Sequence, residues 1–159
     1  MPFPFSPEEV ANRLAIEDLY ARYVFACDDQ QYDVLDQVFL PDAVVDWGHA
    51  KGDREFVKNL IKHNNEISSH LFHFCGNFRI DFAPDLQSAR VKFKMLFPMG
   101  RQGAGGETEM FQVHGSYSDL VVKTAEGWRV KERTWNHGWV VGGLQLIDGE
   151  PALMQKPQE

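Results

Sequence analysis

Residues 16–47, IEDLYARYVFACDDQQYDVLDQVFLPDAVVDW, decide the fold that we expect for this chain. Apolar residues recur at helical spacing through the first part of the stretch, and Asp28 stands where this helix stops. A short second helix, about 32–39, ends before Pro41, and residues 43–47 then form a strand. The stretch predicts two helices and a strand, with a carboxylate at the end of the first helix.

Helix-start signals lie on both sides of this stretch. Ser6, Pro7 and Glu9 form a capping box with proline at the first helical position, so the first helix should begin at Pro7. Asp53 can cap a third helix. The expected buried residues are Val10, Leu14, Leu19, Tyr20, Tyr23, Val24 and Cys27 in the first helix, and Phe56, Leu60 and Ile61 in the third.

The second half of the chain has the pattern of long strands. We expect strands at about 70–82, 88–98, 108–123 and 127–140, separated by turn-rich segments. In the second of these, Val91, Phe93, Met95 and Phe97 alternate with polar residues, which predicts one dry and one wet face. Helices first and strands afterwards indicate an α+β fold, with a curved antiparallel sheet covered by three N-terminal helices.

Composition limits the classes of protein that the chain can belong to. Its 159 residues show no linker or repeat, which indicates a single domain over 1–159. A formal charge of −7 without a Lys/Arg run argues against a nucleic-acid partner. No apolar run approaches the roughly 20 residues of a membrane span, and the first residues lack the features of a signal segment. We therefore expect no membrane partner.

Cysteine and histidine usage points to a cytoplasmic protein without a metal. Cys27 and Cys75 lie in apolar segments without the spacing of a metal knuckle or a disulfide framework, so we expect reduced thiols. Four histidines come from separate segments without a ligand-spacing motif, namely His70, His73, His114 and His137. The glycines of residues 100–106 lack the ending of a phosphate-binding loop and indicate a hairpin loop instead.

Asp28 is the first candidate for chemistry. A carboxylate at the C-terminal end of a helix meets the negative end of the helix dipole and needs a compensating cation or proton donor. The alternative is that Asp28 is a solvated polar residue at a helix stop. From the first forty residues alone, the two interpretations stay open.

His73 lies in residues 69–82, SHLFHFCGNFRIDF, where a bulge at Gly76 would decide which side chains share a face. Glycine inside a strand often marks such a bulge. His73 would then point inward, while Phe72 and Phe74 would point outward, which predicts a homo-oligomer. The alternative is a core histidine bonded to a carbonyl. The expected inward face comprises Leu71, His73, Cys75, Phe78, Ile80 and Phe82.

Other polar and aromatic residues lie on the last two strands. By alternation, His114 lies opposite Phe111, Val113 and Tyr117, and structural and functional roles are equally open for it. Alternation also places Trp135, His137 and Trp139 on one face of the last strand. That strip is either a pocket wall or an interface stripe.

Taken together, residues 8–140 resemble the SnoaL-like branch of the nuclear-transport-factor-like superfamily, near scytalone dehydratase, hexachlorocyclohexane dehydrochlorinase and bile-acid dehydratases. The resemblance implies a conical sheet that encloses a pocket. It rests on the order and spacing of several segments, namely IEDLYARY, the Asp of ACDDQQYDVL, FLPDAVVDW, the His-x-x-x-Asn of His73 to Asn77, and HGSYSDLVVKTAEGWRVKER.

The resemblance also implies a His-Asp dyad, in which His73 removes a proton and Asp28 orients it. Tyr23 matches a tyrosine five residues before the Asp in bile-acid dehydratases. Scytalone dehydratase has tyrosines at the positions of Cys27 and Trp47, which argues against scytalone as substrate. The dehydrochlorinase has an arginine in its pocket for which no counterpart is assigned here, although Arg133 and His137 are near enough to be considered, so halide elimination is not favoured. The expected substrate-binding residues are Trp47, Phe97, His114, Trp135 and His137.

The function that these residues predict is a cofactor-independent lyase, dehydratase-like, acting on a hydrophobic cyclic or polyketide-like small molecule. A carboxylate beside an imidazole raises its basicity and fixes its tautomer, so the imidazole can take an acidic C–H proton. An isomerase or polyketide cyclase would use the same base. A non-catalytic binding or assembly module, such as a dioxygenase small subunit, is the other alternative. The resemblance favours a trimer over a dimer.

Overall fold

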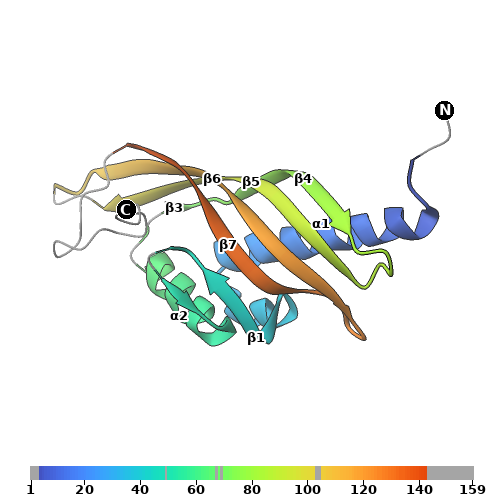
Figure 1. The fold of residues 1–159 in the computed structure, drawn as a ribbon. Helices are drawn as coiled ribbons and strands as arrows, with labels where there is room; N and C mark the ends of the chain where they lie inside the picture. Colours follow the sequence, from blue (N-terminus) through green and yellow to red (C-terminus); the bar gives the residue numbers. More distant parts are fainter. Residues whose placement is uncertain (1–3, 49, 67, 69, 103–104, 143–159) are drawn as a thin grey trace.

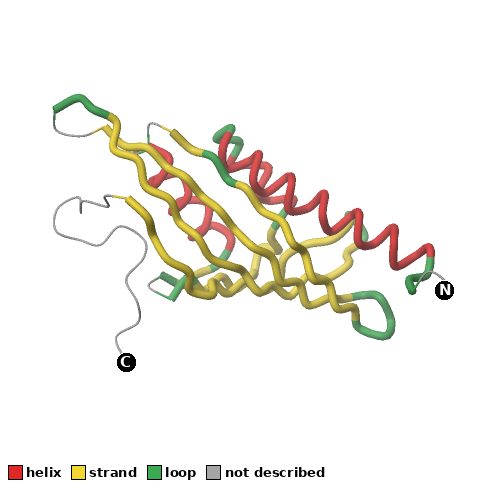
Figure 2. Tube along the Cα trace, turned by 90° about the horizontal axis from the view of Figure 1, so that it is seen from above, coloured by secondary structure: helices red, strands yellow, loops and turns green. Residues whose placement is uncertain are grey.

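The computed structural model describes residues 4–48, 50–66, 68, 70–102 and 105–142, without the side chain of His137. The helices lie on one side of a large curved sheet (Figures 1 and 2). They are α1 (Pro7–Asp28), the 3-10 helix η1 (Tyr32–Gln37) and α2 (Arg54–Glu66). The strands are β1 (Phe39–Asp46), β2 (Lys51–Gly52), β3 (His70–Leu71), β4 (Phe74–Phe82), β5 (Ser88–Gln102), β6 (Thr108–Thr124) and β7 (Gly127–Gly142).

The sheet has the order β2-β1-β7-β6-β5-β3, and β4 pairs with β5 alongside β3. β3 to β7 pair antiparallel, as the sequence predicts. β1 pairs parallel with β7, with Val45 opposite Arg133, so the sheet is mixed rather than wholly antiparallel. The α+β prediction is confirmed, and the parallel pair joins the N-terminal half of the chain to its last strand.

α1 begins as predicted, because Ser6 accepts a hydrogen bond from the Glu9 amide and the Glu9 carboxylate accepts one from the Ser6 amide. The prediction for Leu14 is wrong, since this side chain is 62% exposed. At about 100° per residue, it projects from the side opposite the buried stripe. That stripe comprises Ile16, Leu19, Tyr20, Tyr23, Val24 and Cys27.

The bulge predicted near Gly76 is confirmed. The pairing of β4 with β5 shifts between Gly76 and Arg79, and Asn77 takes a left-handed conformation with φ of 54°. The extra residue returns Phe78 to the inner side, while Phe74 stays outside and 58% exposed. The predicted strand over 70–82 is interrupted at residues 72–73, so His73 lies between β3 and β4.

A second bulge, in β7, corrects the prediction for the last strand. His114 pairs with Trp139 and Ser116 with Asn136, so two residues of β7 stand opposite Gly115 alone. Trp135 therefore faces the core and Trp139 faces outward at 65% exposure. Trp135 and Trp139 do not share a face, because one extra residue reverses the alternation.

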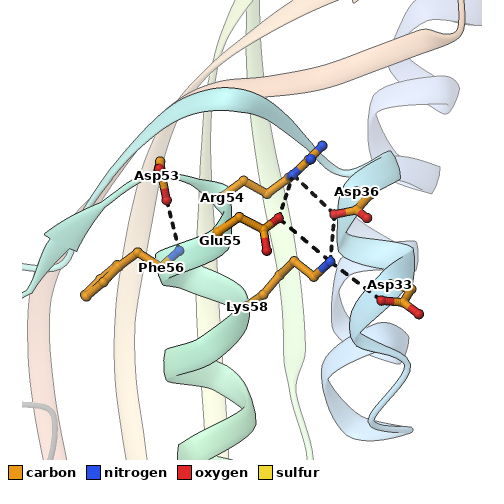
Figure 3. A network of polar contacts seen from close by, with 7 residues as sticks. All are labelled: Asp33, Asp36, Asp53, Arg54, Glu55, Phe56 and Lys58. Atoms are coloured by element: carbon orange, nitrogen blue, oxygen red, sulfur yellow. Dashed lines mark hydrogen bonds and ion pairs between the residues drawn. The ribbon is translucent and has the colours of Figure 1, made fainter.

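α2 is fixed against η1 by a network of charged side chains (Figure 3). Asp53 caps the helix through the Phe56 amide, at 3.0 Å. Lys58 Nζ lies 2.9 Å from an Asp36 carboxylate oxygen, and Arg54 Nε lies 3.2 Å from the same oxygen. The buried stripe of α2 differs from the prediction: Val57, Ile61 and Asn65 are buried, whereas Phe56 and Leu60 lie at its margins.

Candidate active site

The structure brings His73 and Asp28 together, although 45 positions separate them in the chain. His73 Nδ1 lies 2.5 Å from Asp28 Oδ1, and the His73 backbone amide donates to Asp28 Oδ2 at 2.8 Å. The two side chains are 8% and 18% exposed. Because a carboxylate next to Nδ1 holds the proton on that nitrogen, Nε2 is left as the basic nitrogen of the neutral ring.

The position of Asp28 follows from the end of α1. The helix dipole disfavours a carboxylate there, and the two contacts from His73 supply the compensation that the sequence calls for. Asn65 of α2, which is buried, donates from Nδ2 to the backbone oxygen of Cys27 at 2.7 Å. This bond fixes the last turn of α1 immediately before Asp28.

Two aromatic rings flank the imidazole. Phe97 of β5 stacks on the His73 ring, with 3.6 Å between ring centroids and 21° between planes. Tyr23, five residues before Asp28 on α1, presents its ring edgewise at 6.3 Å. Of the predicted site residues, Asp28, His73, Tyr23 and Phe97 therefore gather in one place.

Tyr23 is a protonated donor in this environment. It is 2% exposed, and burial raises the pKa of its hydroxyl well above 10.0. The neighbouring Cys27 thiol, which is hydrogen-bonded to that hydroxyl, raises the pKa further, while the Arg133 cation opposes the shift. The Arg133 guanidinium lies 4.3 Å from the centre of the Tyr23 ring. A phenol held in this state donates a hydrogen bond and does not act as a base.

A buried ion pair adjoins the site, and one of its two residues, Asp119, was not predicted. Arg133 of β7 and Asp119 of β6 are both almost fully buried and form several hydrogen bonds, the shortest of 2.8 Å. The Tyr20 hydroxyl donates to the same carboxylate at 3.0 Å. Among the described residues, Arg133 Nη1 has no hydrogen-bond partner. Sequence analysis missed Asp119, although it has the inward parity of Tyr117.

The remaining predicted substrate-binding residues divide between the two faces of the sheet. Trp47 and Trp135 lie on the inner side, and the Trp135 ring meets Tyr117 at 4.8 Å. His114 lies on the outer face, where it stacks on Trp139 at 5.1 Å, so its expected place beside the dyad is corrected. The side chain of His137 lies outside the described part of the structure.

Within the described ranges, three further observations bear on the predictions. No group of three or more His, Cys, Asp or Glu residues lies close enough together to hold a metal ion. Cys27 and Cys75 are both free thiols. No helix there is long and apolar enough to cross a membrane.

Replacing Asn65 with alanine should lower the free energy of unfolding by about 0.5–1.5 kcal/mol, because the Cys27 carbonyl loses the Asn65 donor at 2.7 Å and keeps only the Gln30 amide at 3.3 Å. Urea unfolding measures this. Asn59→Ala, at an exposed position of the same helix, is the matched control and should change stability by less than about 0.5 kcal/mol. Equal stabilities of the two variants would show that the Asn65 bond does not hold the end of α1.

The free energy of unfolding should decrease as the pH rises into the alkaline range. Burial raises the pKa of Cys27 from 9.0 to about 12 and that of Tyr117 from 10.0 to about 12. Above pH 9 the unfolded chain therefore binds fewer protons than the native one, and the free energy of unfolding decreases as pH rises. Urea unfolding at a series of pH values tests this. Cys27→Ala should flatten the first part of the decrease, and an unchanged slope would contradict the assignment.

Comparison with known proteins agrees with the fold and the family. Residues 8–134 match the family model described as "SnoaL-like domain". The chain belongs to the SnoaL-like family, within the nuclear-transport-factor-like superfamily.

Sequence relatives of this chain occur in mycobacteria. The uncharacterized protein Rv2910c of Mycobacterium tuberculosis is 31% identical over 133 residues, which cover 80% of this chain and 86% of that protein. The uncharacterized protein Mb2934c of Mycobacterium bovis gives the same values.

Solved structures share the fold at lower identity. A Novosphingobium aromaticivorans protein with a provisional scytalone dehydratase name superposes with a TM-score of 0.77 at 20% identity, covering 89% of this chain and 96% of that one. The hexachlorocyclohexane dehydrochlorinase LinA-type3 of Novosphingobium barchaimii gives 0.69 at 17% identity, with coverages of 92% and 97%. These similarities establish the conical α+β fold.

Proposed function

We propose that this protein is a cofactor-independent lyase that eliminates water from a hydrophobic β-hydroxy carbonyl compound, with His73 as the base. The observation that carries the proposal is the double contact of Asp28 with His73, through Nδ1 at 2.5 Å and through the backbone amide at 2.8 Å. An acid fixed in this way holds the imidazole in one orientation and stabilises the cation that forms when it accepts a proton.

In the proposed reaction, one proton passes from a substrate carbon to His73 and then from His73 to the departing oxygen. His73 Nε2 takes the proton from the carbon next to the substrate carbonyl, and the electron pair of that C–H bond becomes the new C=C bond. The C–O bond of the β-hydroxyl breaks, and the imidazolium gives its proton to the departing oxygen. One water leaves and the protein returns to its starting state.

Tyr23 and Phe97 have supporting roles in this scheme. Burial keeps the Tyr23 hydroxyl protonated, so it can donate a hydrogen bond to the substrate carbonyl or the leaving group once it turns from Cys27. Phe97 packs on one face of the imidazole and restricts the ring to the plane in which Nδ1 meets Asp28. The aromatic and apolar side chains around the dyad favour a hydrophobic cyclic or polyketide-like substrate.

The structural neighbours support the reaction class. One carries a provisional scytalone dehydratase name and another is named a hexachlorocyclohexane dehydrochlorinase, and both names denote eliminations. Elimination needs a base next to an acidified C–H bond. The His73–Asp28 pair would supply that base.

The test is a screen of cyclic β-hydroxy ketones and β-hydroxy thioesters, with the products analysed by mass spectrometry. A product lighter than its substrate by one water, formed by the native protein and not by His73→Ala, is the expected result. A product of unchanged mass would mean an isomerase or cyclase that uses the same base. Turnover that survives in His73→Ala would overturn the proposed role of the dyad.

A further inference from the structure

One polar side chain lies in the buried stripe of α2. The stripe consists of Val57, Ile61 and Asn65, at the spacing of four residues that aligns side chains on one face of a helix. Asn65 is 3% exposed. A buried amide lowers stability unless its hydrogen bonds are made, so an apolar residue would be the simpler choice at this position. The amide therefore calls for a role that leucine could not fill.

Asn65 makes the shorter of the two hydrogen bonds that reach the Cys27 carbonyl. The last carbonyl groups of a helix have no partner within the helix itself. The Phe25 and Ala26 oxygens of α1 each accept from a backbone amide at 2.9 Å. The Cys27 oxygen accepts from the Gln30 amide at 3.3 Å and from Asn65 Nδ2 at 2.7 Å. A side chain of α2 thus supplies the nearest donor to the carbonyl that precedes Asp28.

The direction of the Cys27 carbonyl determines where the Asp28 side chain starts. This carbonyl and the Asp28 amide belong to one planar peptide group, so the place of the Cys27 oxygen fixes the place of the Asp28 Cα atom. From there the carboxylate contacts His73 twice, through Nδ1 at 2.5 Å and through the backbone amide at 2.8 Å. Because two contacts at these distances leave little freedom to rotate, a shift of the peptide group would lengthen at least one of them.

The Asn65 bond also acts on the charge of Asp28. The carbonyl oxygens at the C-terminal end of α1 form the negative end of the helix dipole, which disfavours a carboxylate there. The Asn65 amide points its positive N–H dipole at one of these oxygens. It offsets part of the unfavourable field and so favours the charged carboxylate that the imidazole needs beside it.

The two ends of α2 are attached to different parts of the molecule. In its first turns, Lys58 and Arg54 lie 2.9 Å and 3.2 Å from a carboxylate oxygen of Asp36 in η1 (Figure 3). In its last turn, Asn65 bonds to α1. The attachment to η1 and the bond to α1 can therefore be removed one at a time.

We infer that Asn65 is a positioning residue for the proposed base. Through the Cys27 carbonyl, it holds the Asp28 carboxylate in the orientation that keeps the proton on His73 Nδ1 and leaves Nε2 free to accept one. Its effect on turnover rests on the proposed function, whereas the state of the imidazole does not depend on which reaction is catalysed. Asn65 acts through Asp28 and not on the substrate.

Asn65→Leu tests this role, because leucine is close to asparagine in size and has no donor. In protein with isotope-labelled histidine, NMR reports which ring nitrogen carries the proton, and His73→Ala identifies the His73 signals. The neutral ring should carry its proton on Nδ1 in the native protein and on either nitrogen in Asn65→Leu. With the best substrate, kcat should fall by on the order of 10- to 100-fold, while KM stays within about twofold.

Two variants of the same helix serve as controls. Asn59→Leu makes the same substitution at an exposed position, and Lys58→Met removes the attachment of α2 to η1. Both should keep the native His73 tautomer and a kcat within about twofold of the native value. If Asn65→Leu fails to fold, Asn65→Ala replaces it, since its expected loss of stability is small.

An unchanged His73 tautomer in the Asn65 variant would overturn the inference, and so would a native protein in which His73 has no fixed tautomer. A loss of turnover in Lys58→Met as large as in Asn65→Leu would also overturn it, because α2 would then act only through general stability. Failure of the proposed function is recognised separately: turnover would survive in His73→Ala, while the His73 tautomer would still depend on Asn65.

Discussion

Replacing His73 with alanine should lower turnover by on the order of 10²- to 10⁴-fold, which is the usual contribution of a general base. The fold should persist, because the imidazole lies at the interruption between β3 and β4 and not within a paired strand. Asp28 also keeps its bond from the residue 73 amide in this variant, since that donor belongs to the main chain. The measurement is kcat with the best substrate from the screen, together with circular dichroism.

His114→Ala is the control for this prediction. It removes the same side chain from the outer face, away from Asp28, and should leave turnover per folded protein within about twofold of the native value, following the small effects usual away from a site. A comparable loss in both variants would show that histidine removal acts through the fold. A loss confined to His114→Ala would place the chemistry on the other side of the sheet.

Replacing Asp119 with alanine should cost about 3–5 kcal/mol of unfolding free energy, the largest stability effect we expect from a single substitution. The variant leaves the Arg133 guanidinium buried without its carboxylate, and the Tyr20 hydroxyl loses its acceptor. Urea unfolding measures the loss. Glu132→Ala, which breaks the exposed ion pair with Arg90, should cost less than about 1 kcal/mol.

The double variant Asp119→Leu/Arg133→Met separates an unpaired charge from lost packing. Because both charges are removed, it should be more stable than Asp119→Ala, although it changes two buried residues rather than one. If the double variant is less stable than Asp119→Ala, the ion pair stabilises the fold by more than the free-energy cost of desolvating its two charges.

Signals that act over short distances along the chain were sufficient to predict the three helices, the long strands and the bulge in β4, but not the short strand β2. The capping box at Ser6 set the start of α1, and Asp53 set the start of α2. Gly76 indicated the bulge that separates inner from outer residues in β4. Asp28 and His73 were paired through the family resemblance, and the structure places them in contact.

The errors on the sheet arose where the register of distant strands decides which residues meet or share a face. In β7, two residues stand opposite one residue of β6, and this bulge places Trp135 and Trp139 on opposite faces of the sheet. A prediction from strict alternation cannot include such a bulge. Asp119 and Arg133 pair only because β6 and β7 align these two positions. Leu14 shows that an apolar residue on a helix need not lie on the buried stripe.

The parallel pairing of β1 with β7 has a consequence for how the chain is made. β1 is synthesised well before its partner β7, because α2 and the strands β2 to β6 lie between them in the chain. Until then, the Val38 carbonyl lacks the Val130 amide, and Asp119 lacks Arg133. Contacts between such distant segments form slowly, and the apolar surface of a nascent chain stays exposed until β7 has paired with β1. Folding of this domain is therefore expected to be completed only after β7 has been synthesised.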